Sequence, residues 1–128
     1  FGDGKQKRAF SDIKYYMAPF EKIMHRSDCT IFNLGADHEY ELNDIATLVQ
    51  KVAHEFGYQP GIEHLESRLE VKNAFCNHDH AKQLLDFEDN TDIETTIREM
   101  FAWAQQQPVR HMKHMDYEIS KNMYSFWK

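Results

Sequence analysis

The sequence is poor in the residues typical of disulfide-bonded and nucleic-acid-binding proteins, and it lacks a long apolar run. Its 128 residues include only 2 cysteines, 5 glycines and 3 prolines, and 21 acidic residues outnumber 15 basic ones to give a net charge of −6. Cys29 and Cys76 form no short metal-binding or redox spacing, so we expect two reduced thiols. The acidic balance argues against a general DNA- or RNA-binding protein. Because neither a membrane span nor a signal peptide is visible, the sequence predicts a cytoplasmic protein.

The chain does have the composition of a folded domain. Hydrophobic residues make up 41% of it and aromatic residues 13%, which is typical of globular rather than disordered proteins. The length suits a single domain over residues 1–128 with a core of its own, and it is too short for two domains. A small cluster of bases can still bind an anion on such an acidic protein.

Apolar periodicity predicts an α/β fold that is rich in helix, with about five helices and one or two short strands. Helical patterns cover residues 15–26, 42–56, 77–85, 91–108 and 113–127. Short apolar runs predict strands at 30–35 and 62–65, with residues 1–12 as a loop or short strand and 66–77 irregular. Gly57 is expected to end the second helix, and Thr91 with Glu94 has the spacing of a capping box.

The opening run, FGDGKQKRAF, is the most informative stretch. A turn from Gly2 to Gly4 is followed at once by Lys5, Lys7 and Arg8. Glycine lets the backbone come close to a ligand, and the fork of arginine N–H donors matches phosphate. Lys7 stands where a dinucleotide-binding fingerprint needs its third glycine, so the run predicts an anion site of another kind. With no initiator methionine, we expect the run to lie in the middle of a longer protein.

This run resembles the fGdGxQxRxF segment of the extended short-chain dehydrogenase/reductase family, the NAD-dependent nucleotide-sugar epimerases and dehydratases. Further matches follow in the family's order: residues 31–35 resemble fNlG, 40–46 the ySlneLa helix start, 68–71 the R-x-g/e-D/V element, 82–87 KAxxlLGf and 91–103 the T-x-leeGi…W helix. Three features depart from the pattern: the usual second acid is absent from residues 12–15, Glu41 replaces a usual serine cap, and Asp86 replaces the glycine of LGf.

The resemblance implies that this chain is the C-terminal, substrate-binding portion of a UDP-glucose 4-epimerase-like enzyme. In the family an N-terminal Rossmann domain binds NAD and contains the catalytic Tyr-x-x-x-Lys, while the C-terminal portion closes over a UDP- or dTDP-linked sugar. The sequence contains no such Rossmann domain, so we expect a fragment that is inactive alone and binds no NAD itself. Its expected partners are a nucleotide sugar and the missing Rossmann domain, with self-association through exposed apolar surface as a further expectation.

The resemblance points to four substrate-binding residues: Gln6, Arg8, Asn33 and Arg68. Arg8 and Arg68 are expected to neutralise the diphosphate without a metal, since arginine binds phosphate in a bidentate manner. The alternatives are a solvated Arg8 and an ion pair from Arg68 to Glu66 or Glu70. Asn33 lies near the end of a predicted strand, where its side chain either faces a ligand or caps the turn.

No catalytic residue is assigned. Tyr117 with Lys121, and Tyr124 with Lys128, have the Tyr-x-x-x-Lys spacing, but such spacings arise by chance and the family's catalytic pair lies upstream of the opening run. We therefore interpret both pairs as coincidental.

Histidine spacing raises a metal hypothesis, at His78 with His80 and at His111 with His114. No cysteine or carboxylate set completes either site, so we expect solvated histidines and no metal. The remaining alternative function is a stand-alone helical protein-interaction module. It would dock through apolar residues of the last helical segment, namely Met112, Met115, Met123, Phe126 and Trp127.

Overall fold

The computed structural model describes residues 1–110, and the helix expected at 113–127 lies outside this range. In chain order the elements are β1 (Lys7–Ala9), the 3-10 turn η1 (Ile13–Tyr16), α1 (Met17–Met24), β2 (Glu39–Glu41), α2 (Leu42–Glu55), β3 (Asn73–Ala74), α3 (Asp79–Leu85) and α4 (Ile93–Gln105). The helix-rich α/β class is confirmed, but residues 1–110 contain three short strands where one or two were expected. Among the helices described, none is both long and apolar enough to cross a bilayer.

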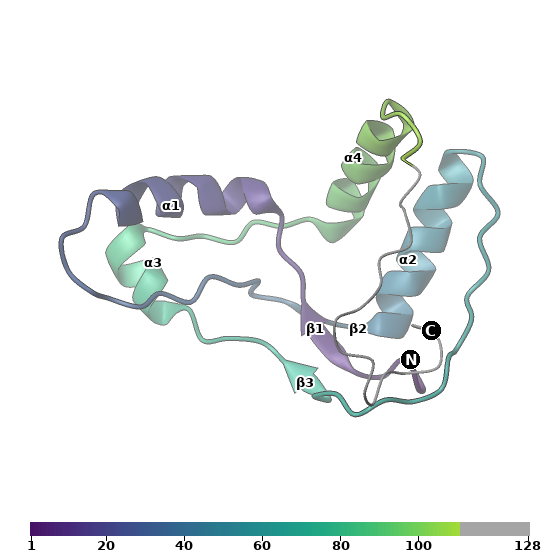
Figure 1. Cartoon of the computed structure of the whole chain (residues 1–128), viewed down its shortest axis with the longest axis horizontal. Coiled ribbons are helices and arrows are strands. Elements are labelled where there is room, and N and C mark those ends of the chain that lie inside the picture. Colours follow the sequence, from purple (N-terminus) through teal and green to yellow (C-terminus); the bar gives the residue numbers. More distant parts are fainter. Residues whose placement is uncertain (111–128) are drawn as a thin grey trace.

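The three strands form a mixed sheet in which β1 is the middle strand. The order is β2-β1-β3, with β1 antiparallel to β2 and parallel to β3. Arg8 therefore pairs with Tyr40 on one side and with Ala74 on the other. Figure 1 shows the strands between two helix pairs, α1 with α3 and α2 with α4. The sheet thus brings the start of the chain next to the segment that precedes α3.

Two strand predictions are wrong. Residues 30–35 and 62–65 have no regular structure, whereas the stretch expected to be irregular, 66–77, contains β3. The apolar side chains of Phe32 and Leu34 pack against the core around α3, while Ile31 is exposed. An apolar run of this length can either form a strand or cover a core without regular structure. Here its side chains pack against a helix, and within residues 1–110 its backbone pairs with no strand.

The core at one end lies between α1 and α3. Ala81, Leu85 and Phe87 are fully buried, and Tyr16 and Ile23 pack against them. The Tyr16 and Phe87 rings meet edge to face with centroids 5.8 Å apart. Pro19, which the sequence placed inside the first helix, occupies the first turn of α1, where a backbone N–H has no intrahelical acceptor in any case. Phe20 and Met24 of the same helix are exposed.

The second helix pair matches the sequence prediction closely. Val52 and Ala53 of α2 and Ile97 of α4 are buried, and the Phe56 and Phe101 rings stack with centroids 5.6 Å apart. Ion pairs join the same helices, from Lys51 to Glu94 and from Arg98 to Glu55. Gly57 has a φ of +84°, a left-handed conformation that glycine adopts freely, and it follows the C-cap residue of α2 as expected.

Asp12 links the segment after β1 to the start of α4. Its carboxylate accepts hydrogen bonds from the Lys14 backbone N–H (3.0 Å) and from the Thr96 hydroxyl (3.0 Å). Its own backbone N–H donates to the Thr91 hydroxyl (2.9 Å). The capping box predicted on Thr91 is therefore wrong, because Thr91 binds Asp12 while Asp92 caps α4 by accepting from the Glu94 N–H.

Replacing Asp12 with asparagine is expected to destabilise the protein by about 1–2 kcal/mol at neutral pH. The Lys14 N–H, together with the Lys14 and Thr96 side chains, lowers the pKa of Asp12 from its usual 3.8 against the opposing effect of burial. Since the folded-state pKa lies below the unfolded-state pKa, this stabilisation is complete above pH 3.8 and is lost as the pH falls through the folded-state pKa. Urea unfolding of both proteins across this pH range measures the difference.

The exposed Glu88, changed to glutamine, is the control and should show little difference at any pH. A wild-type advantage over Asp12→Asn that stayed constant or grew in acid would contradict the assignment of this stabilisation to the Asp12 carboxylate.

Candidate functional site

The opening run and the stretch before β3 lie side by side because β1 pairs with β3 in parallel. Two backbone hydrogen bonds extend this contact, from the Gly2 N–H to the Leu65 carbonyl (3.0 Å) and from the Lys7 N–H to the Lys72 carbonyl (2.8 Å). Side chains that are more than sixty positions apart in the sequence therefore share one surface.

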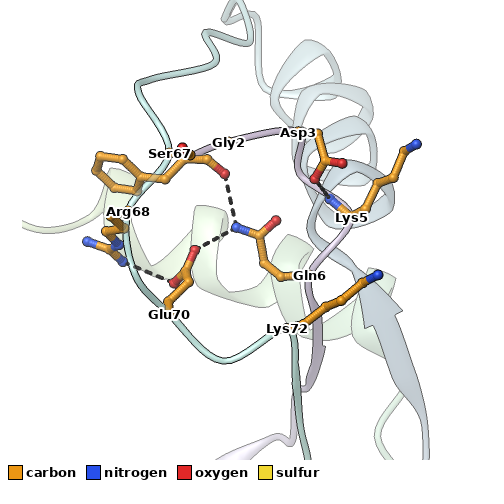
Figure 2. A pocket seen from close by; sticks show the side chains of 9 residues that line it. Gly2, Asp3, Lys5, Gln6, Ser67, Arg68, Glu70 and Lys72 are labelled. Carbon is orange, nitrogen blue, oxygen red and sulfur yellow. Dashed lines mark hydrogen bonds and ion pairs between the residues drawn. The ribbon is translucent and has the colours of Figure 1, made fainter.

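A pocket of about 460 Å³ opens between these two segments, within the size range of small-molecule sites. Figure 2 shows the residues that surround it: Phe1, Gly2, Asp3, Lys5, Gln6, Ser67, Arg68, Glu70 and Lys72. Three of them are cationic and two are anionic. The balance of charge is thus positive on a chain whose overall charge is negative, which favours an anionic ligand.

Four side chains meet in what we call the Glu70 cluster: Gln6, Arg8, Arg68 and Glu70. Gln6, Arg68 and Glu70 line the pocket, and Arg8 reaches Glu70 without lining it. The Gln6 amide donates to Glu70 Oε1 (2.7 Å) and to the Phe1 carbonyl (3.0 Å). Arg8 Nη2 and Arg68 Nη2 each lie 3.5 Å from the same atom, Glu70 Oε2. Three of the four predicted substrate-binding residues therefore converge on one carboxylate.

The two arginines of the Glu70 cluster are also held by other groups. Arg8 Nη1 donates to the Lys7 carbonyl (2.7 Å) and to the Lys72 carbonyl (3.3 Å). The Arg68 guanidinium lies over the Phe1 ring, 4.1 Å from its centroid, in a cation–π contact. These contacts hold the guanidinium groups near the pocket independently of Glu70.

The Glu70 carboxyl is ionised in this surrounding. The hydrogen bond from Gln6 is the main cause that lowers the pKa of Glu70. Burial opposes it, and the positive charges of Arg68 and Arg8 lower the pKa further. The ion pair to Glu70 was one of the alternatives that the sequence left open for Arg68. This ion pair does form, and both of its residues line the pocket. Arg68 can therefore pair with Glu70 and still face a ligand site.

Gly2 lines the pocket, whereas Gly4 has a structural use that differs from the expected close approach to a ligand. Gly4 has a φ of +69°, and a Cβ there would lie 1.9 Å from the Asn43 amide oxygen. Asn43, in the first turn of α2, donates from its side chain to the Asp3 carbonyl (2.9 Å) and from its backbone N–H to the Gly4 carbonyl (3.0 Å). Gly4 therefore lets the opening run anchor on α2, which positions the Gln6 and Arg8 side chains that follow.

Asn33 is the one predicted residue outside the Glu70 cluster. Its side chain is exposed and donates to the Asn77 carbonyl (3.4 Å), which ties the connection after α1 to the start of α3. This contact corresponds to neither of the two uses that the sequence suggested, and residues 30–35 form no strand whose end could present Asn33.

The histidine spacing at His78 and His80 does not produce a shared site. His78 is buried, and its Nε2 lies 2.6 Å from Asp37 Oδ1, whereas the His80 ring packs on Phe32 with centroids 5.2 Å apart. Lys82 also donates to Asp37 (2.7 Å), so this carboxylate fixes the loop before β2 on α3. Across residues 1–110, no three His, Cys, Asp or Glu side chains are placed to hold a metal ion. His111, His114 and the Tyr117–Lys121 and Tyr124–Lys128 pairs lie outside the described residues.

The central position of Glu70 was not predicted. Two features of the sequence point to Glu70: it lies two residues after Arg68, and it is a possible ion-pair partner of that arginine. Neither indicates that Gln6 and Arg8 reach the same carboxylate, because that depends on the pairing of β1 with β3.

No protein-family model matches this chain, and no curated protein sequence does either. Solved structures do match. UDP-glucose 4-epimerase from Thermotoga maritima with UDP-glucose has 21% identity and a TM-score of 0.70 over 83% of this chain and 35% of its own. UDP-glucuronic acid 4-epimerase from Bacillus cereus, with UDP-glucuronic acid and NAD, has 21% identity and a TM-score of 0.69 over 83% and 34%. A dTDP-glucose 4,6-dehydratase from Bacillus anthracis, with NAD, has 16% identity and a TM-score of 0.68 over 82% and 33%.

The chain thus spans only 33–35% of the length of these structures. At this level of identity the match establishes the fold. The structure resembles one portion of the nucleotide-sugar epimerases and dehydratases of the extended short-chain dehydrogenase/reductase family.

Proposed function

We propose that this chain is the part of a nucleotide-sugar epimerase or dehydratase that holds the substrate's diphosphate, with Arg8 and Arg68 as its cationic ligands and Gln6 beside them. The convergence of these three side chains on Glu70, which lines the pocket, is the observation that supports the proposal most directly. Two arginines match the charge of a diphosphate diester, and each can donate two parallel hydrogen bonds to phosphate oxygens. The resemblance to structures solved with UDP-sugars supports the same ligand.

Within this proposal, the reaction itself belongs to a partner that binds NAD. The residues that line the pocket comprise arginine, lysine, glutamine, serine and two carboxylates, which suits anion binding and offers no hydride acceptor. The chain would bind and orient the sugar nucleotide by its diphosphate, and the NAD-binding part would perform the oxidation and return of hydride. NAD is accordingly a cofactor of the whole enzyme.

An exposed apolar surface suits that partner. Ile13, Met17, Phe20 and Met24 follow one another at helical spacing on η1 and α1, and each is at least 44% exposed. Ile13 also lines a hollow of about 430 Å³ with Met100 and Trp103 of α4, which are both 64% exposed. An apolar surface that joins two helices in this way is typical of a protein–protein contact. We propose that it packs against the NAD-binding domain.

Calorimetric titration with UDP, pyrophosphate and uridine tests the proposal. UDP and pyrophosphate are expected to bind at least about tenfold more tightly than uridine, because the diphosphate provides the charged contacts. Equal affinity for UDP and uridine would contradict the assignment of the pocket to the diphosphate. Epimerase turnover of UDP-glucose by this chain alone would contradict the division of labour between two domains.

A further inference from the structure

Glu70 places a negative charge where the proposed ligand would place its own. Its Oε1 atom accepts a hydrogen bond from the Gln6 amide, and its Oε2 atom faces the Nη2 atoms of Arg8 and Arg68. Guanidinium groups bind carboxylate and phosphate with the same donor geometry. The donors proposed to bind a diphosphate are thus already directed toward an anion that belongs to the chain itself.

The contacts within the Glu70 cluster are of unequal strength. Gln6 donates to Glu70 at 2.7 Å, whereas both arginines lie 3.5 Å from Oε2, well beyond the roughly 2.7–2.9 Å of a strong charge-assisted hydrogen bond. The side chains of Arg8, Arg68 and Glu70 are 24%, 29% and 23% exposed, so a ligand can reach all three from solvent. The arginines are therefore positioned by Lys7, Lys72 and Phe1 and only loosely neutralised by Glu70.

We propose that Glu70 is an internal competitor for the anion site, which a diphosphate displaces from Arg8 and Arg68 and which a singly charged anion does not. This inference rests on the proposed function. When a singly charged ligand takes the place of the Glu70 carboxylate, the arginines gain little interaction energy, and Glu70 loses its cationic partners. A diphosphate brings more negative charge and more acceptor oxygens than the carboxylate does. Replacement of Glu70 by a diphosphate at the two arginines is therefore favourable. Glu70 thereby sets the selectivity of the site for doubly charged ligands.

Glu70→Gln tests this role with little change of shape, because the new amide oxygen can still accept from Gln6. Pyrophosphate is expected to bind the variant about five- to tenfold more tightly than wild type. Dimethyl phosphate, a phosphodiester with a single negative charge at neutral pH, should gain by a larger factor, so that the preference for pyrophosphate over dimethyl phosphate falls. Glu70→Asp, which keeps the charge, should stay within about twofold of wild type for both ligands. Glu66→Gln removes an exposed carboxylate of the same stretch and is the matched charge control, with an expected change below about twofold.

The outcomes distinguish a failure of the competitor role of Glu70 from a failure of the proposed function. If wild type binds pyrophosphate and Glu70→Gln binds it equally or less tightly, Glu70 is a scaffold for the arginines and the competitor role is wrong, while the proposed function stands. If neither protein binds pyrophosphate, both proposals fail. A measurement on wild type alone covers the case of a variant that does not fold. The NMR signal of the Gln6 side-chain amide should shift on saturation with pyrophosphate, because its acceptor moves away, and an unchanged signal would overturn the competitor role.

Discussion

Alanine in place of Phe87 is expected to lower the free energy of unfolding by about 3–5 kcal/mol, the largest effect on stability that we predict for one substitution. The ring is 1% exposed and packs in the core between α1 and α3. It meets the Tyr16 ring at 5.8 Å and the His78 ring at 5.5 Å, both edge to face. Its removal leaves a cavity bordered by residues of three separate segments, which cannot all collapse into it.

Urea unfolding followed by circular dichroism measures this effect. Phe75→Ala removes the same number of atoms from a ring that is 64% exposed, and it should cost less than about 1 kcal/mol. If Phe87→Ala and Phe75→Ala had similar costs, the packing of α1 on α3 would not depend on the buried ring.

Simultaneous replacement of Arg8 and Arg68 by alanine is expected to weaken pyrophosphate binding by about a hundredfold. Each guanidinium faces Glu70 and is proposed to supply charge-assisted donors to the ligand. Each is also partly exposed, so we expect about tenfold from each rather than the larger effects of fully buried pairs. Arg8→Lys should restore only part of the loss, since an ammonium group keeps the charge without the two parallel donors.

The matched control removes two positive charges from other parts of the surface. Arg26 pairs with Asp28 and Lys51 pairs with Glu94, and neither residue lines the pocket. The double variant Arg26→Ala with Lys51→Ala should change the affinity for pyrophosphate by less than about threefold at physiological salt. A comparable loss in both double variants would mean that net charge, and not the pocket, determines binding.

Local sequence patterns predicted the helices well because those helices are determined locally. The apolar stripe of residues 42–56 and the left-handed glycine that follows it need no distant partner to be recognised, and both are confirmed. Asp86 departs from the family's glycine, yet it adopts the left-handed conformation with a φ of +50° and caps α3. Aspartate tolerates this conformation better than most residues do, and Lys22 donates to its carboxylate, which adds a favourable contact.

Strands and the site depend on contacts that local patterns do not contain. The run at 30–35 is apolar enough for a strand, but the Phe32 and Leu34 side chains cover the core at α3. The resemblance to a family singled out Gln6, Arg8 and Arg68, which the structure brings together, and also Asn33, which it places elsewhere. The meeting of the first three at Glu70 follows from a parallel strand pair of two residues, too short to be recognised from periodicity.

The middle position of β1 also has a consequence for the order in which the chain acquires its structure. Every strand contact in the described sheet involves β1, so the sheet forms only when residues 39–41 and 73–74 have both reached the first nine residues. Contacts over such sequence separations form slowly relative to a helix such as α2, because the intervening loops must close first. The pocket, whose walls come from the opening run and from the stretch just before β3, is therefore among the last features to assemble, and its binding capacity reports a chain that has finished folding.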